Sequence, residues 1–225
     1  MTFPGARTTI ELPFVNRAQA ARHLADRLRP FGHSAPLVLA IPRGGVPIGR
    51  VVADRLGGDL DVVLVRKLGA PFQPEVAIGA VDESGWVHLA PDSSLVDGGP
   101  EYVQHAIQTQ RLLLSQRAAR YRGQGAAIDC AGRVTIVVDD GLATGSTMIA
   151  ALHAVRARKP AYLVCAVPVA SERGLRSVEP YADEIISLAT PLRFGSVGNF
   201  YLDFRAVSDD EVVALLKPRP STRSA

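Results

Sequence analysis

Two adjacent carboxylates close a largely apolar stretch in the second half of the chain. Asp139 and Asp140 directly follow residues 134–138, whose apolar character is typical of a strand buried on both faces. Ionised carboxylates lose hydration at the end of a buried strand, so a purely structural role there has a large desolvation cost. Adjacent carboxylates suit paired hydroxyl groups or a metal ion. The pair therefore predicts the binding of a diol or a metal.

The loop after this pair has the composition of a phosphate cradle. It offers glycine, small side chains, hydroxyl groups and the backbone N–H groups at the start of an expected helix over residues 146–158. The alternative is an ordinary strand-to-helix turn with Ser146 as its N-cap. The whole string favours phosphate binding over that alternative. The expected binding residues are Gly141, Leu142, Ala143, Thr144, Gly145, Ser146 and Thr147.

Another glycine-rich turn lies nearer the start of the chain. Residues 37–41 form an unbroken apolar strand pattern, and Arg43, Gly44 and Gly45 come soon after it. Glycine lets the backbone approach a ligand closely, and an arginine guanidinium donates two parallel hydrogen bonds to phosphate oxygens. Taken alone, the turn fits a structural strand-to-helix connection equally well. Together with the acidic pair, it is interpreted as a second anion-binding loop.

A third candidate loop begins with two cations. Arg66 and Lys67 follow the next expected strand, residues 62–65. Cations at the end of a strand in such a sheet are expected to bind an anionic group of the ligand. The alternative is that they are surface charges that merely flank the strand.

These loops need a scaffold that brings strand ends together. Apolar runs alternate with helical patterns along the chain, which predicts an α/β fold with a central parallel sheet flanked by helices and right-handed crossovers. Ligands bind such a sheet at the carboxyl ends of its strands, where the candidate loops lie. The expected strands are residues 37–41, 62–65, 134–138 and 162–167, and the expected helices are residues 15–29, 46–56, 101–122 and 146–158.

One segment does not fit this alternation. Residues 69–99 are rich in proline and glycine and are expected to form a mobile excursion from the sheet, with a hairpin whose arms are residues 77–81 and 86–89. The long helix over residues 101–122 follows. Its leucines at 112–114 are expected on or near the buried face, and its arginines are expected in solvent.

Composition narrows the class of protein. The chain has 225 residues, 47% hydrophobic content, a formal charge of +3 and a pI near 9.1, without a run long enough to span a membrane or a visible secretory signal. We therefore expect one domain over residues 1–217, a tail at 218–225, a cytoplasmic location, and no membrane or nucleic-acid partner. Cys130 and Cys165 are expected to be buried thiols, and the scattered histidines predict no zinc site.

Residues Val137 to Thr147 resemble the signature of the type I phosphoribosyltransferases, and the similarity extends over most of the chain. Within that family the chain resembles bacterial phosphoribosyltransferase-domain proteins of unassigned substrate. The resemblance implies that Asp139 and Asp140 hold the ribose 2- and 3-hydroxyls of phosphoribosyl diphosphate. It implies that the loop from Gly141 to Thr147 wraps the 5-phosphate. A Walker-type loop is a poor rival, because the chain has no Gly-Lys-Ser/Thr string.

The resemblance also assigns the remaining loops. It implies that Arg43, Gly44 and Gly45 form the pyrophosphate loop, and that Arg66 and Lys67 bind the leaving pyrophosphate. The excursion after them resembles the family's flexible catalytic loop, which closes over the substrate and excludes water. Glu75 in that excursion is a candidate proton acceptor for the incoming base. A small hood over the base is expected at residues 190–204, with Phe194, Phe200 and Tyr201 available for stacking or serving as plain hydrophobic cover.

The implied reaction displaces pyrophosphate from C1 of the ribose by a nitrogenous base or a small amine, as in nucleotide metabolism. Mg²⁺ is the implied cofactor, touched by Asp139 and Asp140 through water at most, and dimers are common in the family, so a homodimer is one expected assembly. Two other functions stay open. One is a non-catalytic sensor or regulator that binds phosphoribosyl diphosphate, and the other is an enzyme of phosphorolysis or hydrolysis at the same site.

One residue departs from part of the family. Members that act on 6-oxopurines commonly have an aspartate where this chain has Ala143, and that aspartate can act as a general base. Alanine moves no proton, so guanine and hypoxanthine are disfavoured as acceptors. The string from Leu142 to Gly145 looks more like adenine phosphoribosyltransferases, but the similarity outside the loops is too small to assign adenine.

Overall fold

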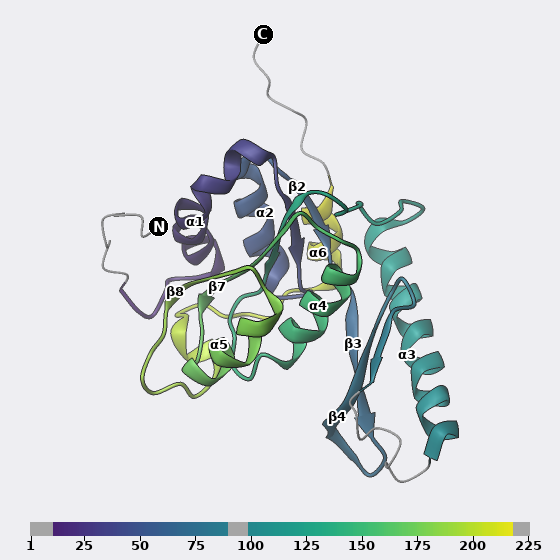
Figure 1. The fold of residues 1–225 in the computed structure, drawn as a ribbon. Helices are drawn as coiled ribbons and strands as arrows, with labels where there is room; N and C mark the ends of the chain where they lie inside the picture. The colour runs from purple at the N-terminus through teal and green to yellow at the C-terminus, as the bar shows by residue number, and fades with distance from the viewer. Residues whose placement is uncertain (1–10, 90–98, 218–225) are drawn as a thin grey trace.

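The computed structural model describes residues 11–89 and 99–217 (Figure 1). The expected tail at 218–225, the first ten residues of the expected domain and part of the expected excursion lie outside these ranges. The elements, in chain order, are α1 (Arg17–Leu28), β1 (Leu37–Ala40), α2 (Gly45–Leu56), β2 (Asp59–Val62), β3 (Val65–Ala70), β4 (Gln73–Asp82), β5 (Val87–Leu89), α3 (Gly99–Arg122), β6 (Val134–Val138), α4 (Ser146–Ala157), β7 (Tyr162–Val169), α5 (Glu172–Val178), β8 (Glu184–Ala189) and α6 (Asp209–Leu216), with short 3₁₀ helices η1 (Arg29–Ser34), η3 (Glu179–Tyr181) and η4 (Val197–Phe200).

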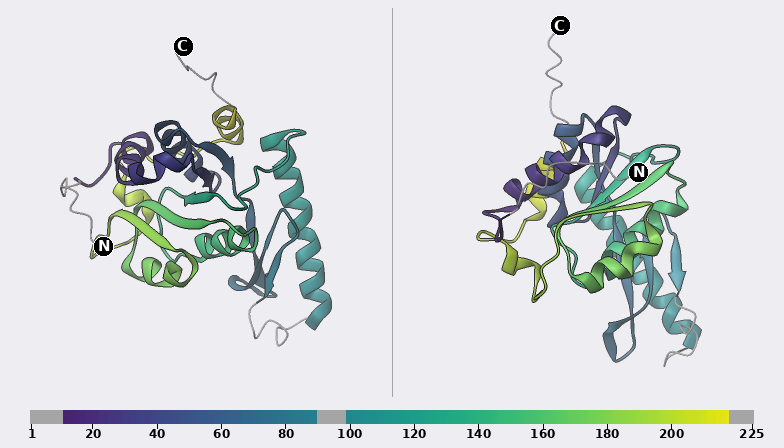
Figure 2. Two further views of the ribbon diagram at one scale, coloured as in Figure 1. Left: turned by 45° about the horizontal axis from the view of Figure 1, so that its top comes forward. Right: turned by 60° about the vertical axis from the view of Figure 1, so that its left-hand side comes forward.

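The central sheet is the parallel sheet that the sequence predicted. Its strand order is β2-β1-β6-β7-β8, and every neighbouring pair is parallel. Figure 2 shows the layers, with α1 and α2 on one side of the sheet and α4 and α5 on the other. The register pairs Ala40 with both Val62 and Val138, so the carboxyl ends of β1, β2 and β6 lie side by side. The candidate loops after β1 and β6 therefore meet at one edge.

Both faces of the sheet are buried, as the unbroken apolar strands required. In β1, Leu37 and Leu39 pack into the core layer of α4, while Val38 and Ala40 pack into the core layer of α1 and α2. All four residues have no solvent-exposed surface. Alternate side chains of one strand thus supply two different core layers, which fixes the register of the strand against both.

A smaller antiparallel sheet projects from this core. Its strand order is β3-β4-β5, and α3 packs along it (Figure 1). The expected hairpin is confirmed, since Gly79, Ala80 and Val81 pair with Leu89, His88 and Val87. The second expected parallel strand is wrong in its bounds: β2 ends at Val62, and Val65 already begins β3. A run of apolar residues spans the sheet-to-sheet junction, so periodicity alone did not reveal where the chain turns.

Helix α3 buries less of its leucine run than the sequence predicted. Leu114 is buried, but Leu112 is 60% exposed and Leu113 is 40% exposed. A helix places only residues three or four apart on one face, so three consecutive leucines cannot all face the core.

One arginine of α3 also contradicts the expectation of a solvated face. Arg122 donates to Asp61 at 2.7 Å and to Glu83, and all three side chains are largely buried. This ion-pair cluster joins the end of α3 to β2 and to the turn between β4 and β5. It anchors the antiparallel sheet and its helix to the central sheet.

Three elements near the end of the chain went unpredicted. They are α5, β8 and α6, which complete the sheet edge and its helical cover. Within residues 11–89 and 99–217, no helix combines the length and the apolar character that crossing a membrane requires.

Candidate functional site

The two acidic residues lie where β6 ends, directly against the glycine turn that follows β1. A Cβ atom on Gly44 would lie 1.9 Å from Asp140 Oδ2, and one on Gly45 would lie 2.7 Å from the Val138 carbonyl oxygen. Only glycine allows this close approach. The structure thus brings together Gly44, Gly45, Asp139 and Asp140, as the sequence predicted. The peptide bond from Pro42 to Arg43, just before these glycines, is cis.

The electrostatics of the acidic pair are unusual. Burial raises the pKa of Asp139 well above its ordinary value, and the adjacent charge of Asp140 raises it further. Burial also raises the pKa of Asp140, but its hydrogen bonds from Arg17 oppose that shift. The Asp140 N–H donates to Asp139 Oδ1 at 2.8 Å. The pair is therefore held in a fixed geometry with Asp140 as the better stabilised anion.

Arg17 is a site residue that sequence reasoning missed. Its Nε and Nη2 donate to Asp140 Oδ2 at 2.9 and 2.7 Å, and its Nη1 donates to the Arg205 carbonyl oxygen at 2.9 Å. The guanidinium also lies over the Phe204 ring, 3.9 Å from its centroid. Arg17 is the first residue of α1, after the N-cap Asn16. The sequence separation of 123 residues from Asp140 left no local pattern to reveal the pair.

The loop after the acidic pair turns its carbonyl groups inward. Backbone and hydroxyl groups of Ser171 donate to the carbonyl oxygens of Leu142 and Ala143, and Ser177 Oγ donates to that of Thr144. For the N–H groups of residues 143–147, the described part of the chain provides no acceptor. Free N–H groups at the start of α4 form an anion-binding surface. The geometry fits the predicted phosphate cradle.

Glycine is required at one position of this loop. Gly145 has φ +83°, in the left-handed region, and a Cβ there would lie 2.4 Å from Ser177 Oγ. The turn before α4 is therefore accessible only to glycine without strain.

Lys67 reaches this loop from the antiparallel sheet. Its Nζ donates to Ser146 Oγ at 2.5 Å, and Thr144 Oγ1 lies 3.1 Å from the same hydroxyl. Arg66 and Lys67 were expected in a loop after a parallel strand. They instead lie within β3, paired with Val81 and Ala80. The correction matters because a strand holds these cations in a defined position beside α4.

Two other predicted site residues have less definite surroundings. Arg43 is exposed. The pKa of Asp209 is lowered mainly by the hydrogen bond from Tyr121, and the charges of Arg120, Arg117 and Arg43 lower it further. Glu75 lies within β4 rather than in a loop, in the part of the strand nearest its turn from β3. The Glu75 side chain is outside the described part of the structure, so its suggested role as a proton acceptor stays a prediction.

The expected hood lies over the acidic pair. It contains η4, and Tyr201 donates its hydroxyl to the Asp140 carbonyl oxygen at 2.6 Å. Tyr201 is buried against Phe14, with ring centroids 5.5 Å apart, and Phe194 packs on Phe200 at 5.0 Å. These aromatic residues pack on one another, which matches the expected hydrophobic cover.

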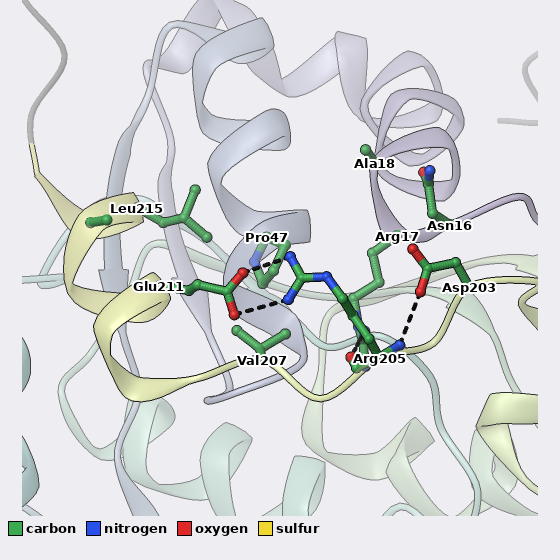
Figure 3. Close-up of a pocket in the computed structure, with 10 residues that line it drawn as sticks. Asn16, Arg17, Ala18, Pro47, Asp203, Arg205, Val207, Glu211 and Leu215 are labelled. Carbon is green, nitrogen blue, oxygen red and sulfur yellow. Dashed lines mark hydrogen bonds and ion pairs between the residues drawn. The ribbon is translucent and has the colours of Figure 1, made fainter.

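A hollow of about 440 Å³ lies behind Arg17 (Figure 3). Its polar side chains are paired with the protein itself: Arg205 donates to Glu211, and the Arg205 N–H donates to Asp203. Its remaining surface includes Pro47 and Val207. These polar groups of the hollow are therefore hydrogen-bonded to one another. Arg17, which also lines the hollow, is hydrogen-bonded to Asp140.

Comparison with known proteins is consistent with this geometry. The family described as Phosphoribosyl transferase domain matches residues 15–205. Two curated proteins of Mycobacterium tuberculosis, from strains CDC 1551 and H37Rv, carry the provisional name phosphoribosyl transferase and are 43% identical over 204 residues. That match covers 90% of this chain and 46% of each relative, so the chain spans about half the length of these relatives.

Solved structures share the fold. The protein TT1426 from Thermus thermophilus is 44% identical, with a TM-score of 0.83 over 91% of this chain and 98% of that chain. A Neisseria gonorrhoeae protein, solved with bound ppGpp, is 15% identical, with a TM-score of 0.51 over 89% of this chain and 90% of that chain. The second likeness shows a shared fold alone.

Proposed function

This chain belongs to the phosphoribosyl transferase domain family, and on that premise we propose that it transfers the ribose 5-phosphate group of phosphoribosyl diphosphate to a nitrogen nucleophile. One observation carries the proposal. The Asp139–Asp140 pair, the Gly44–Gly45 turn and the N–H groups of residues 143–147 converge at the edge of the sheet formed by β1 and β6. The acidic pair suits a diol, the glycine turn lets a ligand approach the backbone closely, and the N–H groups suit an anion. Together they fit one ligand, a ribose that carries phosphate groups.

Each part of the ligand has a proposed partner. The carboxylates of Asp139 and Asp140 accept hydrogen bonds from the ribose 2- and 3-hydroxyls. The 5-phosphate accepts hydrogen bonds from the free N–H groups of residues 143–147 and from the hydroxyls of Thr144, Ser146 and Thr147. The pyrophosphate lies against the turn of Arg43, Gly44 and Gly45 and near Arg66 and Lys67.

The proposed reaction breaks the bond between C1 of the ribose and the pyrophosphate oxygen. That oxygen keeps the electron pair, and the lone pair of the acceptor nitrogen forms the new bond to C1. The acceptor nitrogen then loses one proton, and Glu75 is the candidate proton acceptor on this chain. Positive charge develops on the ribose in the transition state, so the chain contributes mainly by positioning and electrostatics.

The residues present fit a Mg²⁺ ion held largely by the substrate. Within the described residues, Asp139 Oδ2 and Asp140 Oδ1 accept no hydrogen bond, and carboxylate oxygen is the donor type that Mg²⁺ prefers. The same residues contain no cluster of three metal-ligating side chains. Such a donor set suits contacts through water. When bound, Mg²⁺ neutralises charge on the pyrophosphate oxygens.

The proposed acceptor is a nitrogenous base or a small amine. Ala143 is exposed in the loop and has no group that accepts a proton, which disfavours 6-oxopurines. A cytoplasmic location and a homodimer stay predictions.

Two alternatives have distinct signatures. A sensor binds phosphoribosyl diphosphate without turnover, and a hydrolase or phosphorylase uses the ribose-phosphate site with water or phosphate. The presence of Arg43, Arg66 and Lys67, of which Lys67 contacts Ser146 in the cradle, favours transfer, because a pure sensor has less need of contacts to a leaving group.

The test incubates the protein with phosphoribosyl diphosphate, Mg²⁺ and a panel of bases and amines, and measures pyrophosphate release. We expect release with at least one acceptor and a loss of about a hundredfold or more in Asp140→Asn, since that change removes a charge that positions the ribose. Tight binding without release for any acceptor contradicts the transferase and supports the sensor. Release that needs no acceptor supports hydrolysis.

A further inference from the structure

Among the described residues that line a small cavity between β3, α3 and α4, the charged ones are all cations. Figure 1 shows these three elements side by side, and their packing agrees. The cavity volume is about 270 Å³. Arg66 and Lys67 come from β3, and Arg117 comes from α3, outside every motif that the sequence suggested. The lining residues are Val65, Arg66, Lys67, Arg117, Thr147 and Ala150.

The cations of this cavity have no ion-pair partner among the described side chains. Among them, no carboxylate forms an ion pair with Arg66, Lys67 or Arg117. Lys67 donates to the neutral hydroxyl of Ser146. Neighbouring like charges repel one another, so an anion that enters the cavity relieves this repulsion and gains hydrogen bonds from guanidinium groups.

Helix α3 holds Arg117 in a defined position. Tyr121 follows one turn later on the same face, about 6 Å along the helix axis. Its hydroxyl donates to Asp209 Oδ1 at 2.6 Å, and burial raises the pKa of Tyr121 to about 12, so this donor keeps its proton at neutral pH. Arg122 is fixed by its buried ion pairs. The part of α3 that carries Arg117 is thus tied to the core.

Arg117 and Arg43 approach the same region from different elements. The charges of both arginines act on Tyr121 and on Asp209. The Asp209 carboxylate already accepts hydrogen bonds from Tyr121 and Arg120, so it does not neutralise either arginine by an ion pair. Arg117 therefore contributes both to the cavity next to the start of α4, with Arg66 and Lys67, and to the positive charge that Arg43 directs at Tyr121 and Asp209.

We propose that this cavity receives the leaving pyrophosphate and that Arg117 binds it. The inference rests on the proposed function. It assigns the pyrophosphate rather than the 5-phosphate to the cavity, because the 5-phosphate suits the N–H cradle of residues 143–147, whereas the cavity offers cationic side chains. Pyrophosphate carries more negative charge than a phosphate monoester, which matches three lining cations. Arg117 thus stabilises the charge that develops as the bond at C1 breaks.

The experiment measures binding of inorganic pyrophosphate, with Mg²⁺ present, by calorimetry on the full chain. Arg117→Gln is compared with Arg27→Gln, which removes the same charge from an exposed position on α1. We expect Arg117→Gln to weaken pyrophosphate binding about tenfold or more, since a charge-assisted hydrogen bond is lost, and Arg27→Gln to change it less than about twofold. Arg117→Lys restores part of the affinity, because the charge stays but the planar fork is lost. Equal thermal midpoints confirm that all variants fold.

Further ligands distinguish the ways in which the inference fails. Ribose 5-phosphate carries the 5-phosphate without pyrophosphate, and we expect its affinity to be the same in Arg117→Gln and the wild type. If Arg117→Gln weakens ribose 5-phosphate and spares pyrophosphate, the cavity belongs to the 5-phosphate and the inference is wrong. Unchanged pyrophosphate binding in Arg117→Gln also overturns it, whatever the transferase activity. Wild-type pyrophosphate binding that depends on Arg117, without transfer to any acceptor, supports the cavity and contradicts the transferase.

Discussion

The guanidinium of Arg17 donates two hydrogen bonds to a single oxygen of Asp140, at 2.9 Å from Nε and 2.7 Å from Nη2. The other Asp140 oxygen accepts no hydrogen bond within the described residues, so the ion pair orients the carboxylate and leaves Oδ1 for a ligand. Both side chains are largely buried, with exposed fractions of 11% for Arg17 and 14% for Asp140. Arg17 thus fixes the orientation of a residue far from it in the sequence.

The first prediction concerns the pH dependence that Arg17 imposes. Burial raises the pKa of Asp140, and the hydrogen bonds and charge of Arg17 oppose that larger effect. Arg17→Gln removes the groups that oppose this effect, so it raises the pKa of Asp140 further. In the proposed function an ionised Asp140 accepts a hydrogen bond from a ribose hydroxyl group, so the variant moves the acid limb of the kcat/KM profile to higher pH. We expect a larger loss of activity near about pH 6 than near about pH 8. The measurement is pyrophosphate release across this range.

Two controls accompany this profile. Arg17→Lys keeps the positive charge, so its acid limb is expected to lie between those of the wild type and Arg17→Gln. Arg27→Gln, on the exposed side of α1, is expected to leave the acid limb unchanged. An equal loss of activity at every pH in Arg17→Gln contradicts the role of Arg17 in ionisation and indicates a purely structural effect.

The second prediction concerns the close approach of the glycine turn to the acidic pair. A Cβ at position 44 would lie 1.9 Å from Asp140 Oδ2, so Gly44→Ala must displace that carboxylate from Arg17. We expect an affinity for phosphoribosyl diphosphate lower by about tenfold or more, since the loss of one charge-assisted hydrogen bond has that magnitude. Gly32→Ala is the matched control, because its Cβ would meet no atom closer than 3.7 Å. Similar affinities in the two variants contradict the steric argument.

The third prediction concerns the anchor of the antiparallel sheet. Arg122→Ala leaves the buried carboxylates of Asp61 and Glu83 without their cation and lowers the free energy of unfolding by about 3–5 kcal/mol. Arg120 lies on the same helix, but its side chain is 53% exposed and pairs with Asp209 at 3.0 Å. Arg120→Ala is therefore expected to lower the free energy of unfolding far less than Arg122→Ala does, because solvent screens an exposed ion pair. Denaturant titration measures both, and equal losses argue against a buried anchor.

The fourth prediction concerns a stack of rings between the hairpin and α4. Trp86, the single tryptophan of the chain, stacks on His88 and His153, and the two histidine rings lie 4.7 Å apart. Burial lowers the pKa of His153, and the charge of His88 lowers it further. The folded state thus favours neutral His153. Its contribution to stability is present above the ordinary imidazole pKa of about 6.5 and is lost as pH falls through the lowered value.

The measurement for this stack is unfolding at several pH values, followed by the fluorescence of Trp86. His153→Phe keeps a ring in the stack and cannot take up a proton, so its stability is expected to depend less on pH than that of the wild type. If the two proteins lose stability in parallel as the pH falls, other groups are responsible.

The sequence by itself determined that the chain folds around a parallel sheet, and it located the candidate binding loops. Strands such as residues 37–40 are apolar throughout because both faces are buried, and that pattern is readable from the sequence alone. The loops at 42–45 and 139–147 were recognisable because close backbone approach and phosphate binding require specific residue types at fixed local spacing. These local requirements also carried the resemblance to the family.

The tertiary structure decided which residues meet from distant parts of the chain. Arg17 lies 123 positions from Asp140, and Arg117 and Lys67 line one cavity only because α3 packs beside β3. The bounds of β2 and β3 were unreadable because one apolar run crosses the junction of two sheets. Arg122 looked like a solvated charge because its buried partners, Asp61 and Glu83, come from other elements. Side-chain type and local period are written in the sequence, whereas long-range pairing and burial depend on how whole elements pack.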